Sequence, residues 1–298
     1  MSYLVLAHRQ PALLARLVAR LWHPDDEIVV HVDRKVAQEP FRAALADLPG
    51  NVALAHERFV CHWGGTGVLH ATVSSMRAFA ARPGPTHLVV MTGQDYPIKP
   101  LATLRALLAG DPDATYLSWS AGDPGSSRTD PGESRRWVWG GELDRLVRRH
   151  YLVLPPWSAL TTRRFVSLPQ PYVPFIGTKQ IPAGLTPYHG GAYFSMARAA
   201  VECCLEVLDA RPRLLPWFSR VLAPDEFVFQ MLLLNSALAD TVVNDDLYFI
   251  RWKGWHPEVL TDRDLPALLA SPALLARKCD ATQSASLLDA LDARVHGL

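Results

Sequence analysis

The sequence predicts an α/β fold in which a mainly parallel central sheet is flanked by helices. Strand and helix patterns alternate through the first 120 residues, and two of the strands are continuous apolar runs rich in β-branched residues, as in strands covered on both faces. Hydrophobic residues make up 49% of the 298-residue chain. This is enough to bury a large core in one domain.

The front half alternates strands with helices. Residues 3–8 form an apolar strand, and Pro11, a residue favoured in the first helical turn, opens a helix that runs to Leu21. Residues 27–33 (EIVVHVD) and 87–92 (HLVVMT) are the two buried strands. Further helices are expected at 41–48, 67–81 and 101–108, and further strands at 51–55 and 115–119.

The rear half begins irregularly. Residues 122–133 have the composition of a surface loop, residues 137–149 mix aromatics with arginines, and residues 155–187 are rich in proline. Regular patterns then return: a strand at 192–196, a helix at 197–208, a helix that starts near Pro224, a strand at 247–252, and helices near 263–270 and 285–295. We therefore expect a single domain over residues 1–298, with a nucleotide-binding half at 1–120 and an acceptor and catalytic half at 121–298.

Charge and composition exclude several classes of protein. Thirty basic residues against 29 acidic ones leave a net charge of +1, which predicts neither a nucleic-acid nor a membrane partner. The first apolar run is too short for a signal peptide, and no apolar stretch could span a bilayer, so we expect a cytoplasmic protein. The four cysteines lack metal-ligand spacing and are expected to be free thiols. No phosphate-binding glycine loop follows the first strand, which disfavours P-loop and dinucleotide enzymes.

Polar residues follow three of the predicted strands. His8 follows the first strand, Asp33 ends the second, and Gln94 and Asp95 follow the strand at 87–92. Ligands of open α/β sheets bind beyond the carboxyl ends of the strands, so we expect these residues to meet at one rim. Asp33 could also be an exposed turn residue, and Asp95 a turn former that supports its neighbours.

Four blocks of sequence carry a family resemblance. HVDRK at 31–35, TGQDYPIK at 92–99, APDE at 223–226 and ARK at 276–278 have the order and similar spacing found in the core-2/I-branching β-1,6-N-acetylglucosaminyltransferases and the peptide O-xylosyltransferases. Weaker similarities occur at 4–8, 63–65 and 260–261. The chain resembles this family from residue 3 to about residue 280, and least across the irregular middle.

The resemblance implies a GT-A type, Rossmann-like glycosyltransferase fold. It further implies a UDP-sugar donor, with UDP-N-acetylglucosamine or UDP-xylose expected, inversion at the anomeric carbon, and no requirement for a divalent metal or other cofactor. The acceptor is expected to be a glycan or a small natural product. The donor-side candidates are the strand-end residues His8, Asp33, Gln94 and Asp95, since a carboxylate at a strand end can accept hydrogen bonds from a ribose or base.

Glu226 is the expected catalytic base. Inverting transfer needs a group that takes the proton from the acceptor hydroxyl as its oxygen attacks the sugar. Pro-Asp-Glu is also a common way to open a helix, and from spacing alone Glu226 reads as an ordinary first-turn acid. The resemblance makes this glutamate the base, with Asp225 supporting its geometry.

Arg277 and Lys278 are expected to bind the diphosphate of the donor. Bond cleavage leaves negative charge that must be neutralised, and two adjacent cations can do this without a metal. Asp111 and Asp113 have metal-ligand spacing but fall in a loop after a helix. An exposed basic pair near a helix end is the structural alternative for Arg277 and Lys278.

The acceptor side is less clearly marked. The resemblance places His189, Gly190 and Tyr193 near the transferred sugar, and Trp252 with Arg251 at an acceptor-side strand end. Tryptophans can present flat faces to sugars, although a tryptophan is more often part of a core. The further candidates of this kind are Trp137, Trp139 and Trp255.

Two other functions remain open. A catalytically inactive homologue could bind a nucleotide sugar or glycan, but it would not need a base such as Glu226. A glycoside hydrolase would need a second carboxyl group facing Glu226, and the sequence offers no convincing candidate. Turnover of a UDP-sugar in the presence of a chelator distinguishes these functions.

Overall fold

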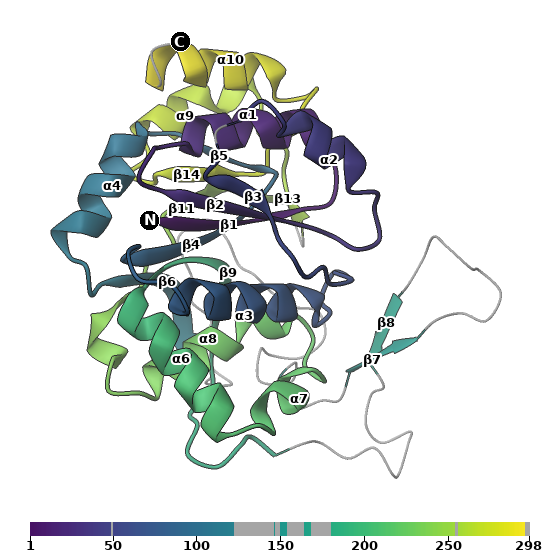
Figure 1. The fold of residues 1–298 in the computed structure, drawn as a ribbon, viewed down its shortest axis with the longest axis vertical. Coiled ribbons are helices and arrows are strands. Elements are labelled where there is room, and N and C mark those ends of the chain that lie inside the picture. The colour runs from purple at the N-terminus through teal and green to yellow at the C-terminus, as the bar shows by residue number, and fades with distance from the viewer. Residues whose placement is uncertain are drawn as a thin grey trace.

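The computed structural model describes residues 1–48, 50–121, 146, 150–153, 164–167, 180–253 and 256–295. Their centre is a seven-stranded sheet with the strand order β10-β6-β9-β4-β1-β2-β3 (Figure 1). Its strands are β1 (Ser2–Ala7), β2 (Glu27–Val32), β3 (Val52–Leu54), β4 (His87–Thr92), β6 (Thr115–Ala121), β9 (Tyr188–Ala197) and β10 (Val242–Val243). Neighbouring strands are parallel, except that β9 runs antiparallel to both β4 and β6. The predicted mainly parallel sheet is confirmed.

Helices cover both faces of the central sheet (Figure 1). Side chains of β1 alternate between the faces: Tyr3 and Val5 join the core beneath α1, whereas Leu4 joins the core beneath α3. This two-sided burial is why the parallel strands read as unbroken apolar runs. The first core is covered by α1 (Pro11–Leu21), α2 (Glu39–Ala44), α4 (Leu101–Gly110), α9 (Leu265–Ala270) and α10 (Ala285–Val295). The second is covered by α3 (Gly67–Ala80), α6 (Arg198–Ala210), α7 (Leu214–Phe218) and α8 (Val228–Leu234).

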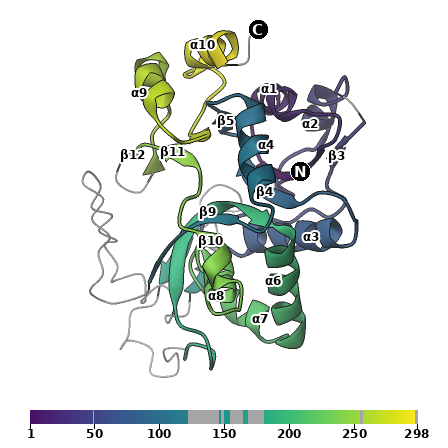
Figure 2. The same ribbon diagram turned by 90° about the vertical axis from the view of Figure 1, so that its left-hand side faces the viewer.

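A second sheet of three strands lies on the α1 side of the molecule. Its order is β11-β14-β5, with β11 (Tyr248–Ile250) parallel and β5 (Asp95–Pro97) antiparallel to the central β14 (Leu275–Arg277). Tyr96 and Leu275 of this sheet join the same core as α9 and α10, which lie beyond it (Figure 2). The small sheet therefore brings the segment after β4 beside the end of β14.

The remaining elements are short. Hairpin-like pairs form from β12 (Trp252–Lys253) with β13 (His256–Pro257) and from β7 (His150–Val153) with β8 (Arg164–Ser167). Three 3₁₀ turns complete the described elements: η1 (Pro224–Glu226), η2 (Ala239–Thr241) and η3 (Asp262–Asp264).

Several predicted elements change in the structure. The helix expected to start near Pro224 is the 3₁₀ turn η1 followed by α8, and the strand expected at 247–252 is divided into β11 and β12. β8 lies within residues 155–187, which the sequence marks as irregular. The three-residue strands β5 and β14 were not predicted, because so short a segment shows no periodicity.

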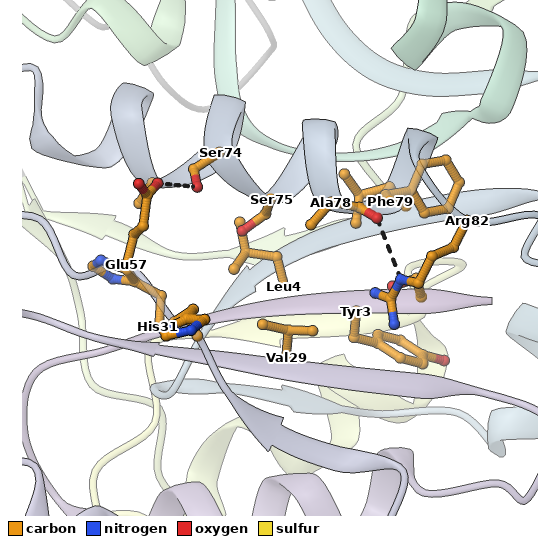
Figure 3. Close-up of a pocket in the computed structure, with 15 residues that line it drawn as sticks. Tyr3, Leu4, Val29, His31, Glu57, Ser74, Ser75, Ala78, Phe79 and Arg82 are labelled. Carbon is orange, nitrogen blue, oxygen red and sulfur yellow. Dashed lines mark hydrogen bonds between the residues drawn. The ribbon is translucent and has the colours of Figure 1, made fainter.

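A cavity of about 150 Å³ lies between α3 and strands β1 and β2 (Figure 3). It exists because α3 turns small side chains, including Ala71 and Ser75, toward Leu4 and Val29 of the sheet. Its lining includes none of the predicted site residues, so we assign it no function.

Candidate active site

The carboxyl ends of β1 and β2 lie side by side and carry His8 and Asp33. The two strands pair in parallel with Ala7 opposite Val32, so the residues that follow them share one edge of the sheet. Burial lowers the pKa of the His8 imidazole, Arg9 lowers it further, and the Asp33 carboxylate opposes the change. Arg277 also acts on His8. The structure thus brings Asp33 and Arg277 within electrostatic range of His8.

Asp33 organises the loop above the end of β2. Asp33 is only 3% exposed, and its carboxylate accepts hydrogen bonds from the backbone N–H of Lys35 (2.9 Å) and of Cys61 (3.3 Å). The Lys35 ammonium lies 3.3 Å from the carboxylate and donates a 2.6 Å hydrogen bond to the Cys61 carbonyl oxygen. The carboxylate is therefore fixed in place at the rim, whereas the sequence allowed an exposed turn residue.

Arg277 ends β14 and is held by a buried carboxylate. Its Nη1 donates hydrogen bonds to Asp95 Oδ1 (2.7 Å) and to Thr92 Oγ1. Asp95 is 0% exposed, and it also accepts hydrogen bonds from the Thr92 backbone N–H (2.6 Å), the Thr92 hydroxyl (2.8 Å) and the Tyr248 hydroxyl (3.0 Å). Asp95 lies behind Arg277 and orients it, the supporting role that the sequence left open.

Tyr193 connects Arg277 with the segment that carries Glu226. The Arg277 guanidinium carbon lies 5.1 Å from the centroid of the Tyr193 ring, which packs 5.0 Å from the ring of Tyr248. Burial raises the pKa of the Tyr193 phenol, and the positive charge of Arg277 opposes that rise. The carboxylates of Asp225 and Glu226 add to the rise. Tyr193 therefore contacts the cation, and its strand β9 packs against the turn that carries the predicted base.

Glu226 ends the 3₁₀ turn η1, and Phe227 separates it from α8. The turn is entered through Ala223, which has a φ of 52°, and the Ala223 N–H donates a 2.7 Å hydrogen bond to the Gly64 carbonyl oxygen. Gly64 has a φ of 69°, and a Cβ at this position would lie 2.7 Å from a methyl group of Leu222. The Trp63-Gly-Gly65 segment thus supports the turn that presents Glu226, whose side chain is half-buried.

Gln94 and Lys278 lie in two segments of the chain that are hydrogen-bonded to each other. Gln94 is 4% exposed, and its side-chain amide donates to the Cys279 carbonyl oxygen at 3.2 Å, while the Cys279 N–H donates to the Gln94 carbonyl oxygen at 2.7 Å. Gln94 therefore fixes the chain immediately after Lys278. Burial lowers the pKa of the half-buried Lys278, and the neighbouring charges of Arg9 and Arg277 lower it further. A cation in this position would be stabilised by an anion.

His189 and Gly190 lie in β9, opposite the end of β6. The His189 ring is 6.2 Å from that of Phe227, the residue after Glu226. A Cβ at Gly190 would lie 1.8 Å from the Ser118 carbonyl oxygen, where the pairing of β6 with β9 shifts register. The glycine is required by the close approach of the two strands, because the Cβ of any other residue would collide with that oxygen. Its place on the acceptor side stays a prediction.

Arg251 and Trp252 are held by residues that follow them in the chain. The Arg251 guanidinium donates to Glu258 at 2.6 Å and forms an ion pair with Asp264, so these two carboxylates hold it. Trp252 is half-buried in β12, opposite Pro257. Nothing in these contacts supports acceptor binding, and the assignment stays a prediction. Trp137, Trp139 and Trp255 lie outside the described residues.

The sequence missed Tyr248 as part of the site. It lies in a short apolar strand and reads as an ordinary core residue, because nothing local indicates that its hydroxyl meets Asp95, 153 positions away.

Within the described ranges, no group of three or more His, Cys, Asp or Glu residues is placed to hold a metal ion. The absence of a metal requirement stays a prediction. The four cysteines are free thiols, as expected.

A family model for the Core-2/I-branching enzymes matches residues 1–267. The chain belongs to the Core-2/I-branching enzyme family. The resemblance drawn from the four sequence blocks is thereby confirmed, and the chain is a member of a family of glycosyltransferases. A mainly parallel central sheet flanked by helices is also the architecture expected of a GT-A type domain.

Relatives of this Core-2/I-branching family member include xylosyltransferase 2 of Rattus norvegicus and of Homo sapiens. Each is 24% identical to the chain over 99% of its length, but the matched part is 34% of either relative, so the chain spans about a third of their length. A solved structure of the galactosyltransferase LgtC with donor and acceptor sugar analogs aligns with a TM-score of 0.42 and 10% identity, covering 99% of this chain and 96% of that one. No helix among the described residues is long and apolar enough to cross a membrane.

Proposed function

We propose that the chain is an inverting, metal-independent glycosyltransferase. It would move a sugar, N-acetylglucosamine or xylose, from a UDP-sugar to a hydroxyl group of a glycan or a small natural product. Membership of the Core-2/I-branching enzyme family supports sugar transfer. The arrangement of Glu226, Tyr193 and Arg277 supports the mechanism.

Glu226 acts as the general base. Its carboxylate takes the proton of the acceptor hydroxyl while that oxygen attacks the anomeric carbon of the donor, and the bond from that carbon to the diphosphate oxygen breaks on the opposite face. The half-buried side chain is carried on a turn that the backbone hydrogen bond from Ala223 to Gly64 holds in place. A fixed base near the reacting hydroxyl lowers the entropic part of the barrier.

Arg277 and Lys278 neutralise the diphosphate as it leaves. The Asp95 carboxylate and the Tyr193 ring hold the Arg277 side chain in one orientation, so little reorganisation is needed when negative charge develops. Lys278 adds a point charge in an already positive environment. Asp33 would contact the ribose or base of the nucleotide through the carboxylate oxygen that lies 3.3 Å from the Lys35 ammonium.

The observation that carries the proposal is the position of Tyr193. Its ring lies 5.1 Å from the Arg277 guanidinium carbon, and its strand β9 packs against the turn η1 that carries Glu226. A base and a phosphate-binding cation that share one neighbouring ring can act on the two sides of a single scissile bond.

The test is the substitution Glu226→Gln. UDP release from UDP-N-acetylglucosamine and UDP-xylose is measured with EDTA present and with a mixture of glycan and natural-product acceptors, and donor binding is measured by calorimetry. Loss of the base is expected to slow transfer by about 10²–10⁴-fold. The amide keeps the size of the side chain, so the affinity for the donor should hardly change.

Glu202→Gln is the matched control, since Glu202 is an exposed acid of α6 that pairs with Arg198. It should leave both turnover and donor binding unchanged. Equal loss of turnover and donor binding in Glu226→Gln would show a structural role for Glu226. A wild-type protein that binds the donor without turnover would support the inactive homologue.

A further inference from the structure

The loop between β1 and α1 is tied to the chain that follows Lys278. Gln10 has a φ of 54° and precedes the first turn of α1. Its side-chain amide donates a 2.5 Å hydrogen bond to Asp280 Oδ2, and its amide oxygen accepts a 3.3 Å hydrogen bond from the Ala281 N–H. These two contacts place the neighbouring Arg9 at the edge of the candidate active site.

Arg9 is held only loosely there. Its side chain is 43% exposed, and its guanidinium nitrogen lies 3.9 Å from Asp280 Oδ2, beyond hydrogen-bonding distance. Asp280 already accepts hydrogen bonds from Gln10 and from the backbone N–H groups of Thr282 (3.0 Å) and Gln283 (3.1 Å). The guanidinium can therefore leave Asp280 without exposing an unsatisfied carboxylate.

Arg9 lies among other positive groups. Burial lowers the pKa of Lys278. The charges of Arg9 and Arg277 lower it further, and the effect of Arg9 is the larger of the two. Three cations share this edge, and Asp280 is the one carboxylate that offsets the effect on Lys278 among the described residues. Cations held close together repel one another, and a polyanion that binds between them offsets this repulsion.

We propose that Arg9 is a third diphosphate-binding residue, which binds the donor together with Arg277 and Lys278. The ligand class is a nucleoside diphosphate, so this inference rests on the proposed function. The three cations have different tasks. Arg277 is fixed by Asp95 and Tyr193, whereas Arg9 moves from Asp280 onto the phosphate oxygens and contributes the two parallel N–H donors of its guanidinium.

The test is calorimetric binding of UDP, UMP and uridine to the full chain carrying Arg9→Gln. UDP binding is expected to weaken by about 10- to 100-fold, as for loss of a hydrogen bond to a charged group. UMP binding should weaken less, and uridine binding should not change. Arg9→Lys keeps the charge but loses the fork, and its affinity for UDP should fall between those of Arg9→Gln and the wild type.

Two further variants make the result interpretable. Arg42→Gln removes an exposed cation of α2 and should leave UDP binding unchanged, whereas Arg277→Gln should weaken it. Unchanged UDP affinity in Arg9→Gln with weakened affinity in Arg277→Gln overturns the role of Arg9 and leaves the proposed function standing. Equal weakening for uridine and UDP also overturns that role, because it shows an effect on the nucleoside site or the fold. A wild-type chain that binds none of the three ligands refutes the proposed function, and the role of Arg9 with it.

Discussion

Replacement of Asp95 by asparagine is expected to damage both the fold and donor binding. Asp95 is 0% exposed, and its charge is balanced by Arg277, whose side chain is 15% exposed. The amide keeps one oxygen for Arg277 and Thr92, but it presents an N–H₂ group where the other carboxylate oxygen accepts the Thr92 N–H at 2.6 Å. The N–H₂ group of the asparagine and the backbone N–H of Thr92, both hydrogen-bond donors, then face each other.

The magnitude follows from these contacts. Removing one partner of a buried ion pair costs about 3–5 kcal/mol. The substitution also removes the acceptor of the Thr92 N–H, a group that lies in the same network, so the two losses are not added. We expect a loss of about 3–5 kcal/mol in the free energy of unfolding, because most of the Arg277 charge stays in place without its counter-ion.

Urea unfolding followed by fluorescence measures this loss as a lower midpoint with an unchanged slope. Tyr248→Phe is the matched control, because it removes one of the hydrogen bonds to Asp95 and leaves both charges; it should cost about 1.5–3 kcal/mol. Calorimetry with UDP should show weaker binding to Asp95→Asn, since Arg277 loses its fixed orientation. An Asp95→Asn protein with wild-type stability and wild-type UDP affinity would refute the view that this carboxylate orients Arg277, the proposed phosphate-binding cation.

Two further predictions concern Asp292 in α10 and Gly190 in the central strand β9. Burial raises the pKa of the Asp292 carboxyl, but hydrogen bonds from Tyr96 and two arginines outweigh it and keep the pKa below the unfolded value of 3.8. The ionised Asp292 therefore stabilises the fold at pH values above 3.8, and this stability is lost as the pH falls through the lower pKa of the folded state. Asp292→Asn should unfold more easily in urea at pH 7. It should also lose less stability than the wild type between about pH 4 and pH 2. An acid-induced loss equal to that of the wild type would contradict this assignment. Gly190→Ala places a methyl group against the Ser118 carbonyl oxygen and should cost about 3 kcal/mol or more in thermal or urea unfolding. Gly110→Ala, where a Cβ meets nothing within 4 Å, should cost nothing.

The parts of the fold that follow from the sequence are the long elements with a clear period. The helix Pro11–Leu21 and the strand His87–Thr92 are found with the expected bounds, because one has an apolar stripe and the other is buried on both faces. The start of α8 was misplaced, since Pro-Asp-Glu opens a 3₁₀ turn before it opens an α-helix. Nothing in three residues distinguishes such a turn from the first turn of a helix.

Site residues that belong to a sequence motif could be predicted, whereas contacts between distant segments of the chain could not. The sequence could place Asp33 at a strand end and could join Arg277 with Glu226 through the family resemblance. It could not show that Arg277 ends a strand and stacks on Tyr193, because β14 forms only by pairing with β5 and β11. The link from Arg9 to the Arg277 segment likewise depends on one side chain, Gln10, that reaches across about 270 positions.

The pairing of β5 with β14 has a practical meaning for redesign. Asp95 lies opposite Arg277 in that pair, so a chain shortened before β14 would leave a buried carboxylate without its cation. Truncated variants should therefore keep the chain at least to the end of β14.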